Sequence, residues 1–201
     1  MEVVAGIDIG ASRTKCVLLD EKFGSVGVAF KKTLADFEKS ACGALEAAIE
    51  AAGLRRDEVV YVATTGLGRH SVSFRSIQIT DVTCTARGVH LLHPDISFIL
   101  DIGAQTTRAI RKNDKGKVVE FRMNEKCAAG SGSFLERACK YLGLKIEEIG
   151  SISANSRSPQ QISSICAVLA ESEIINHVSE GKAVEDIVRG IHQSLAERSL
   201  M

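Results

Sequence analysis

The sequence has no excess of charge, no long apolar run and few aromatic residues. Its 25 basic and 25 acidic residues give a formal net charge of zero, which favours neither a nucleic-acid partner nor a membrane surface. No apolar stretch approaches the roughly 18 residues of a membrane-spanning helix. Residues 2–10 read as a strand, without the basic-then-apolar pattern of a signal peptide. We therefore expect a cytoplasmic globular protein with no nucleic-acid or membrane partner.

Cysteine is frequent by comparison, with six residues beside two tyrosines and no tryptophan. Disulfides are not expected in the cytosol, so each cysteine is either a small core residue or part of a site. Cys16, Cys42, Cys84 and Cys139 lie among apolar or helical neighbours, and we expect them to be buried. Cys127 and Cys166 have different surroundings.

The tetrapeptide DIGA occurs twice, at residues 8–11 and 101–104. The same offset of 93 residues aligns Thr14 with Thr107 and Lys15 with Arg108. Each copy is flanked by strand-like segments, followed by a third strand after a glycine-containing turn and then by a helix. A repeat of about 90 residues suits a duplicated domain rather than a solenoid. We predict two lobes, residues 1–94 and 95–201, that face each other across a cleft.

Each DIGA segment places an aspartate and a glycine at a strand end. Glycine lets the backbone approach phosphate oxygens, and a carboxylate can hold hydrated Mg²⁺. Two ordinary hairpins are the alternative. We expect Asp8, Asp101 and Gln105 to be catalytic. A further apolar strand over 59–66 ends at Gly66, which we expect to line the same site. The residues expected to contact the nucleotide are Gly10, Ala11, Ser12, Thr14, Lys15, Gly66, Gly103, Ala104 and Thr106.

Two cysteines are expected near helix starts. Cys127 lies in a turn of small residues before a helix, and Cys166 in the first turn of another, with Ser163 or Ser164 as N-cap and Gly181 as the stop. A helix N-terminus stabilises a thiolate or an anionic iron–sulfur cluster. A [4Fe–4S] cluster takes four thiolates, so a homodimer would have to supply them. On the residues alone, two buried cysteines remain the simpler alternative.

Six segments carry a family resemblance: GIDIGASRTK, ATTGLGR, ITDVTCTARG, DIGAQTTRAI, NEKCAAGSGSFLE and SSICAVLAESEIIN. The chain resembles the BadF/BadG/BcrA/BcrD-type ATPases, which are 2-hydroxyacyl-CoA dehydratase activators and ATP-binding subunits of benzoyl-CoA reductase. The resemblance implies an α/β fold of duplicated ribonuclease H-like lobes, as in the actin, sugar-kinase and heat-shock ATPase superfamily. It also implies ATP, Mg²⁺, and one [4Fe–4S] cluster held by Cys127 and Cys166 of two paired subunits.

The implied activity is ATP hydrolysis that drives a low-potential electron onto a CoA-thioester dehydratase or reductase, with ferredoxin or flavodoxin as the donor. The alternatives are a benzoyl-CoA reductase subunit, a small-molecule kinase, and a truncated non-catalytic assembly chain. The sequence departs from the activators' DIGGQD pattern at Ala104 and Thr106. It also has no Gly-Gly dipeptide, which the family uses to cradle adenosine, and we expect the second lobe to be incomplete at its C-terminal end.

Overall fold

The computed structural model describes residues 1–124 and 132–200 of the chain. It divides into two compact units, one of residues 1–98 with 111–120 and the other of residues 99–110 with 121–201. The lobe boundary expected after residue 94 stays a prediction. In the described part of the chain, no helix combines the length and apolar character needed to cross a membrane.

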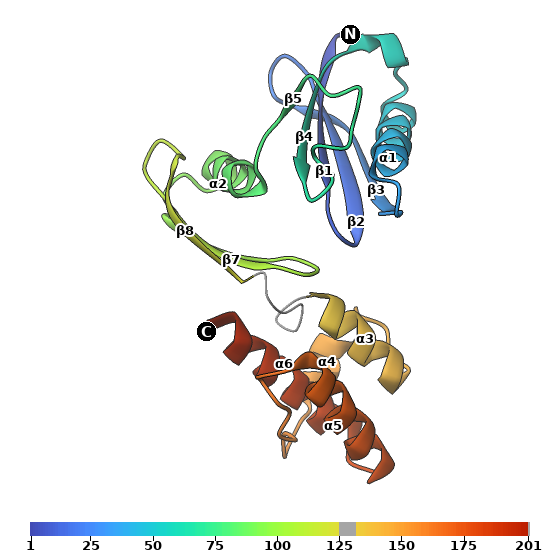
Figure 1. Ribbon diagram of the computed structural model, residues 1–201, viewed down its shortest axis with the longest axis vertical. Helices are drawn as coiled ribbons and strands as arrows, with labels where there is room; N and C mark the ends of the chain where they lie inside the picture. Colours follow the sequence, from blue (N-terminus) through green and yellow to red (C-terminus); the bar gives the residue numbers. More distant parts are fainter. Residues whose placement is uncertain (125–131, 201) are drawn as a thin grey trace. The chain divides into compact units, whose positions relative to one another are not determined.

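A five-stranded sheet forms most of the first unit (Figure 1). Its strand order is β3-β2-β1-β4-β5, with β1 antiparallel to β2 and parallel to β4, as expected for a ribonuclease H-like lobe. Alternate residues of β1 are buried, so one face of the strand builds the core and the other carries Asp8. The elements of this half of the chain are β1 Val3–Ile9, β2 Arg13–Leu19, β3 Ser25–Lys32, α1 Phe37–Ala52, η1 Arg56–Glu58, β4 Val59–Gly66, β5 Ile77–Gln78 and α2 Asp81–Leu92.

Helix α1 covers the core face of this sheet. The Asp36 carboxylate caps its start by accepting the Lys39 N–H at 2.9 Å, and Gly53 ends it with a φ of 65°. Leu45 and Ile49 recur at helical spacing on the buried side, and burying each side chain stabilises the fold by about 1.5–3 kcal/mol. The helix predicted to follow the first three strands is confirmed.

The remaining elements begin with a second strand-strand-strand-helix series, which confirms the predicted duplication. Strands β6, β7 and β8 pair in that order, and α3 follows them as α1 follows β3 (Figure 1). Helices α3, α5 and α6 enclose a core around Phe134, while the short α4 had not been expected. The bounds are β6 Phe98–Ile102, β7 Thr107–Lys112, β8 Val118–Asn124, α3 Gly132–Leu142, α4 Ile149–Ala154, α5 Ala167–Ser179 and α6 Val184–Leu200.

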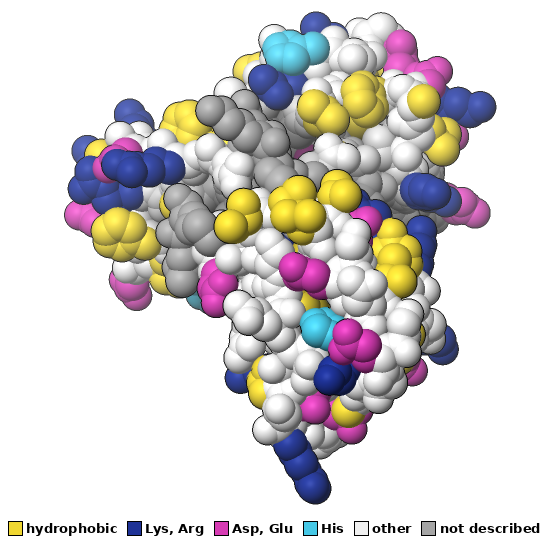
Figure 2. Space-filling view, turned by 60° about the horizontal axis from the view of Figure 1, so that its bottom comes forward, with side chains coloured by type: hydrophobic (Ala, Val, Ile, Leu, Met, Phe, Trp, Pro, Cys, Tyr) yellow, Lys and Arg dark blue, Asp and Glu magenta, His cyan; other side chains and the backbone are white. Residues whose placement is uncertain are grey.

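Hydrophobic side chains also reach the surface, as the space-filling view of one face shows (Figure 2). Three of the most exposed flank the start of α5: Ile165, Val168 and Leu169 have exposed fractions of 85%, 70% and 55%. Clustered exposed apolar residues mark interaction surfaces more often than isolated ones do. The start of α5 is therefore unlike an ordinary solvated helix end.

Candidate functional site

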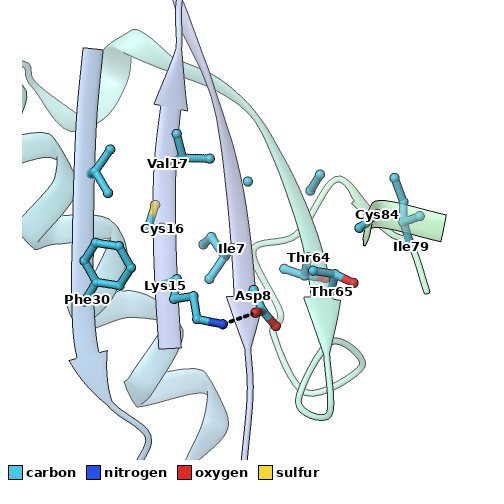
Figure 3. A pocket seen from close by; sticks show the side chains of 13 residues that line it. Ile7, Asp8, Lys15, Cys16, Val17, Phe30, Thr64, Thr65, Ile79 and Cys84 are labelled. Carbon is cyan, nitrogen blue, oxygen red and sulfur yellow. Dashed lines mark hydrogen bonds and ion pairs between the residues drawn. The ribbon is translucent and has the colours of Figure 1, made fainter. Parts of the chain in front are cut away.

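The first DIGA turn places a carboxylate and an ammonium group side by side. Asp8 near the end of β1 is paired in register with Lys15 of β2, and Lys15 Nζ donates to Asp8 Oδ2 at 2.8 Å (Figure 3). Both side chains lie on the sheet face away from α1 and line a cavity of about 370 Å³ with Thr65 of β4. The carboxylate is 35% exposed and the lysine 50%. Both predicted ligand-binding residues therefore face open space.

Two glycines shape this turn. Gly66, at the end of β4, has a φ of 84°, and a Cβ here would meet the Asp8 carboxylate and lie 2.6 Å from the Ile9 carbonyl oxygen. The Gly10 N–H donates to the Arg13 carbonyl at 3.1 Å, closing the turn. Only glycine fits the end of β4 this closely, so Gly66 sets the position of Asp8. Its predicted contact with nucleotide stays a prediction.

Three further residues of the first turn were predicted to contact the nucleotide, and they differ in burial. Thr14 is fully buried, and its hydroxyl shares a hydrogen bond of 2.9 Å with Thr33, which in turn donates to the Gly10 carbonyl at 2.8 Å. Thr14 therefore braces the turn from inside. Ala11 and Ser12 are half-buried at the turn itself. A direct phosphate contact for any of the three stays a prediction.

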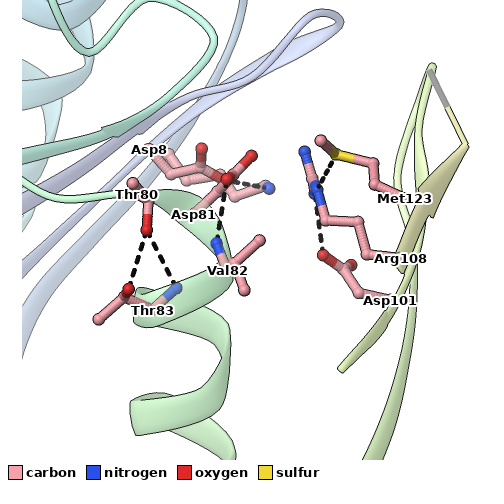
Figure 4. Close-up of polar contacts among 9 residues, drawn as sticks. Asp8, Thr80, Asp81, Val82, Thr83, Asp101, Arg108 and Met123 are labelled. Atoms are coloured by element: carbon pink, nitrogen blue, oxygen red, sulfur yellow. Dashed lines mark hydrogen bonds and ion pairs between the residues drawn. The ribbon is translucent and has the colours of Figure 1, made fainter. Parts of the chain in front are cut away.

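The second DIGA turn repeats the bonding of the first. Arg108 Nη1 of β7 donates to Asp101 Oδ2 of β6 at 3.0 Å, and its Nε donates to Met123 Sδ at 3.2 Å (Figure 4). The Gly103 N–H donates to the Thr106 carbonyl at 2.8 Å, as Gly10 does to Arg13. The ion pair and the turn hydrogen bond thus recur at the same offset of 93 residues. The two copies therefore share these hydrogen bonds as well as the DIGA sequence.

Three predicted ligands complete the second turn. Gln105 is exposed, while Ala104 and Thr106 are half-buried. Their catalytic and binding roles stay predictions.

The start of α3 is bonded directly to the second turn. The Gly132 N–H donates to the Gly103 carbonyl at 2.9 Å, and the Ser133 N–H donates to the Ala104 carbonyl at 3.0 Å. The first N–H groups of a helix have no partner within the helix, and here two of them are satisfied by the turn. A displacement of the turn backbone would therefore be passed to α3.

Cys166 is the N-cap of α5, in extended conformation with φ −137° and ψ 130°. The prediction of a Ser163 or Ser164 cap is wrong, because α5 begins at Ala167 and Cys166 takes the N-cap position. Gly181 follows the last turn with a φ of 69°, so the predicted stop is confirmed. Cys166 is half-buried at a helix N-terminus, where unpaired N–H groups and the helix dipole favour an anionic ligand. Cys127 lies outside the described residues.

A polar network behind Cys166 was missed in the sequence. Arg198 of α6 is buried and donates to the carbonyls of Ser163 and Ser164. Glu173 of α5 accepts the Ser163 N–H at 2.6 Å, and the Ser194 hydroxyl donates to the Ser163 carbonyl at 2.8 Å. One signal could have found it, since Arg198 falls at helical spacing on the buried face of α6 with Ile187 and Ile191.

The other cysteines divide into buried and open thiols. Cys16 and Cys139 are buried as predicted, and burial raises the pKa of the Cys16 thiol to about 12. Cys84 is half-buried. The prediction for Cys42 is wrong: it lies on the outer side of α1, where it is exposed and its thiol donates to Glu46 at 3.3 Å. Its small apolar neighbours belong to the opposite side of the helix.

Comparison with known proteins gives consistent matches. The family model described as the BadF/BadG/BcrA/BcrD ATPase family matches residues 5–200. A benzoyl-CoA reductase subunit of Thauera aromatica is 43% identical over 202 residues, covering 98% of this chain and 71% of that protein. The solved activator of the 2-hydroxyisocaproyl-CoA dehydratase from Clostridium difficile, with bound ADPNP, superposes with a TM-score of 0.92 at 38% identity over 98% of this chain and 74% of that one.

A more distant likeness concerns the fold. A ROK family glucokinase from Streptomyces griseus superposes with a TM-score of 0.54 at 12% identity, over 98% of this chain and 76% of that chain. The predicted α/β fold is thereby confirmed.

Proposed function

The chain belongs to the BadF/BadG/BcrA/BcrD ATPase family, and we propose that it hydrolyses ATP to drive a low-potential electron onto a 2-hydroxyacyl-CoA dehydratase. The observation that carries the proposal is the bonding of α3 to the second turn, because it ties the predicted phosphate site to the segment that follows Cys127. The similarity to a dehydratase activator with bound ADPNP supports the nucleotide and the partner class.

In the proposed reaction, a water oxygen attacks the γ-phosphorus of ATP, and the bond to the bridging oxygen breaks to release ADP and phosphate. The backbone N–H groups of the two turns bind phosphate oxygens. Asp8 and Asp101 would hold hydrated Mg²⁺, which would offset the charge of the phosphates, and Gln105 would orient the attacking water. The proposal requires both turns to reach one nucleotide, and Lys15 and Arg108 to share their carboxylates with the incoming cation.

The described residues fit a shared [4Fe–4S] cluster at Cys166. The thiol is half-buried at the start of α5, no side chain caps that helix start, and three exposed apolar side chains lie within three residues of it in the sequence. A bound cluster supplies one-electron transfer at a potential that charge and solvent exposure tune. Two copies of Cys166 and two of Cys127 provide the four thiolates, so we propose a homodimer or a pair of homologous subunits. Ferredoxin or flavodoxin is the proposed donor.

ATP can change the cysteine segments only through the difference in its affinity for two arrangements of the chain. The hydrogen bonds from Gly132 and Ser133 to the second turn offer a physical route for that difference, because a shift of the turn on phosphate binding would move the carbonyls that hold α3. If ATP binds more tightly to the arrangement that donates the electron, ATP hydrolysis is coupled to electron transfer.

Anaerobic reconstitution tests the proposal. The wild-type dimer should bind about four irons and turn brown, and Cys166→Ser should lose most of the iron. Cys42→Ser is the matched control, since Cys42 is exposed on α1 in the first unit and should leave iron content unchanged. A wild-type protein that folds but stays colourless and iron-free would refute the cluster.

A benzoyl-CoA reductase-type subunit is the second candidate. The 43% identity to the Thauera aromatica reductase chain and the alanine at position 104 favour it. An activator should take up iron as a homodimer, whereas a reductase subunit should need a homologous partner chain. Iron content of the chain expressed alone and with such a partner separates the two.

A further inference from the structure

Arg198 contacts two segments next to the predicted cluster ligands: helix α3, which follows Cys127, and the residues before Cys166. Its side chain is 6% exposed. Its guanidinium carbon lies 4.6 Å from the ring centroid of Phe134, near the start of α3. Its Nε donates to the Ser164 carbonyl at 3.0 Å, and its Nη2 donates to the Ser163 carbonyl. One side chain thus contacts the helix that follows Cys127 and the loop segment that precedes Cys166.

The contacts at Ser163 leave its peptide little freedom. Its carbonyl accepts from Arg198 and Ser194 of α6, and its N–H donates to Glu173 of α5. The guanidinium is a rigid, planar fork, so two adjacent carbonyls held by it cannot rotate independently. Cys166 follows two residues after Ser164, and its direction is therefore set from this anchored peptide.

The guanidinium of Arg198 also stacks on a buried aromatic ring of the same unit. Phe134 is fully buried and packs in the core shared by α3, α5 and α6. It directly follows Ser133, whose N–H is bonded to the second turn. Direct contacts thus run from the turn through α3 to Arg198, and from Arg198 to the residues before Cys166.

We propose that Arg198 is a positioning residue that fixes Cys166 relative to α3 and makes its orientation respond to nucleotide at the second turn. This inference rests on the proposed function for the nucleotide, but the anchoring of Cys166 can be tested without it. Arginine suits the role because it combines an aromatic stacking face with donors that reach both carbonyls.

The rate of Cys166 alkylation in the cluster-free protein measures the anchoring, with each cysteine followed by peptide mass spectrometry. Arg198→Met keeps the apolar stem but removes the donors, and should speed alkylation of Cys166 by about tenfold, because losing bonds to a charged group favours local opening. Arg198→Lys should restore part of the protection. Arg189→Met is the control, since Arg189 is exposed on the same helix and should not change the rate.

Coupling is measured by repeating the alkylation with and without Mg-ATP. Nucleotide should change the Cys166 rate in wild type and in Arg189→Met, and this change should shrink in both Arg198 variants. Equal nucleotide effects in wild type and Arg198→Lys would overturn the coupling, and equal nucleotide-free rates in wild type and both Arg198 variants would overturn the anchoring. If calorimetry detects no nucleotide binding to folded wild type, the proposed function fails, while the nucleotide-free rates still decide the anchoring.

Should Arg198→Met prove unfolded by circular dichroism, the decision rests on Arg198→Lys. That variant keeps the charge and a long stem. A rise in alkylation of Cys139, which is buried in α3 of the same unit, would reveal a general loss of structure there. A rise confined to Cys166 supports positioning. A rise shared equally by both cysteines refutes it.

Discussion

Gly66→Ala tests whether the end of β4 fixes the Asp8 carboxylate. The added methyl group would sit at a φ of 84° and meet the Asp8 carboxylate and the Ile9 carbonyl, the latter at 2.6 Å. A left-handed backbone costs an alanine about 1–2 kcal/mol, and forcing extra volume into a packed site costs about 1–3 kcal/mol more. We expect Gly66→Ala to lower the free energy of unfolding by roughly 2–5 kcal/mol.

Gly53→Ala separates the two contributions. Gly53 has a φ of 65° at the end of α1, and no atom lies within 4 Å of a Cβ built there. It therefore carries the backbone penalty alone, about 1–2 kcal/mol, and should lower the thermal midpoint by a few degrees. Thermal unfolding followed by circular dichroism gives both values, and calorimetry with Mg-ATP should show weaker binding only in Gly66→Ala. Equal destabilisation by the two substitutions would refute the close approach of β4 to Asp8.

Two further predictions concern titratable groups. Burial raises the pKa of the Cys16 thiol to about 12, so Cys16 should resist alkylation at pH 8 in the folded protein. The exposed Cys42 should react within the same time course. Mass spectrometry that finds Cys16 labelled as fast as Cys42 would contradict the burial of Cys16. Burial lowers the pKa of His192, whose Nδ1 lies 2.9 Å from Ser153 Oγ. The unfolded chain then binds the proton more tightly, so this stability is present above the unfolded pKa of about 6.5 and is lost as pH falls through the folded value. Denaturant titrations from pH 8 to pH 5 should show a smaller loss for His192→Gln than for wild type, and parallel curves would exclude His192 as the source.

The first unit could be predicted largely from local pattern. Alternation in residues 3–9, the aspartate cap at Asp36 and the glycine at Gly53 each act within a few residues, so they identify β1 and α1 without knowledge of the rest of the fold. The repeat of DIGA also predicted a repeated turn geometry, because the same short sequence makes the same hydrogen bond in both places.

Features that depend on distant partners could not be predicted in the same way. Thr14 was expected to contact nucleotide, but its hydroxyl is hydrogen-bonded to Thr33, 19 residues away, on the buried side of the strand. Arg198 could not be singled out, because its partners Ser163 and Ser164 lie 35 and 34 residues earlier. The prediction for Cys42 failed for a local reason: consecutive residues of a helix point about 100° apart, so apolar neighbours in sequence need not share a face with it.

The two carboxylate–cation pairs differ in how readily they come apart. Lys15 is half-exposed on a flexible stem, and exposed pairs of this kind contribute at most about 1 kcal/mol, so Asp8 can exchange its partner cheaply. Arg108 is only 13% exposed and is held by Met123 as well as Asp101. Separating it leaves a less solvated guanidinium, which is the costlier event. An incoming cation would therefore displace Lys15 from Asp8 more readily than it would displace Arg108 from Asp101.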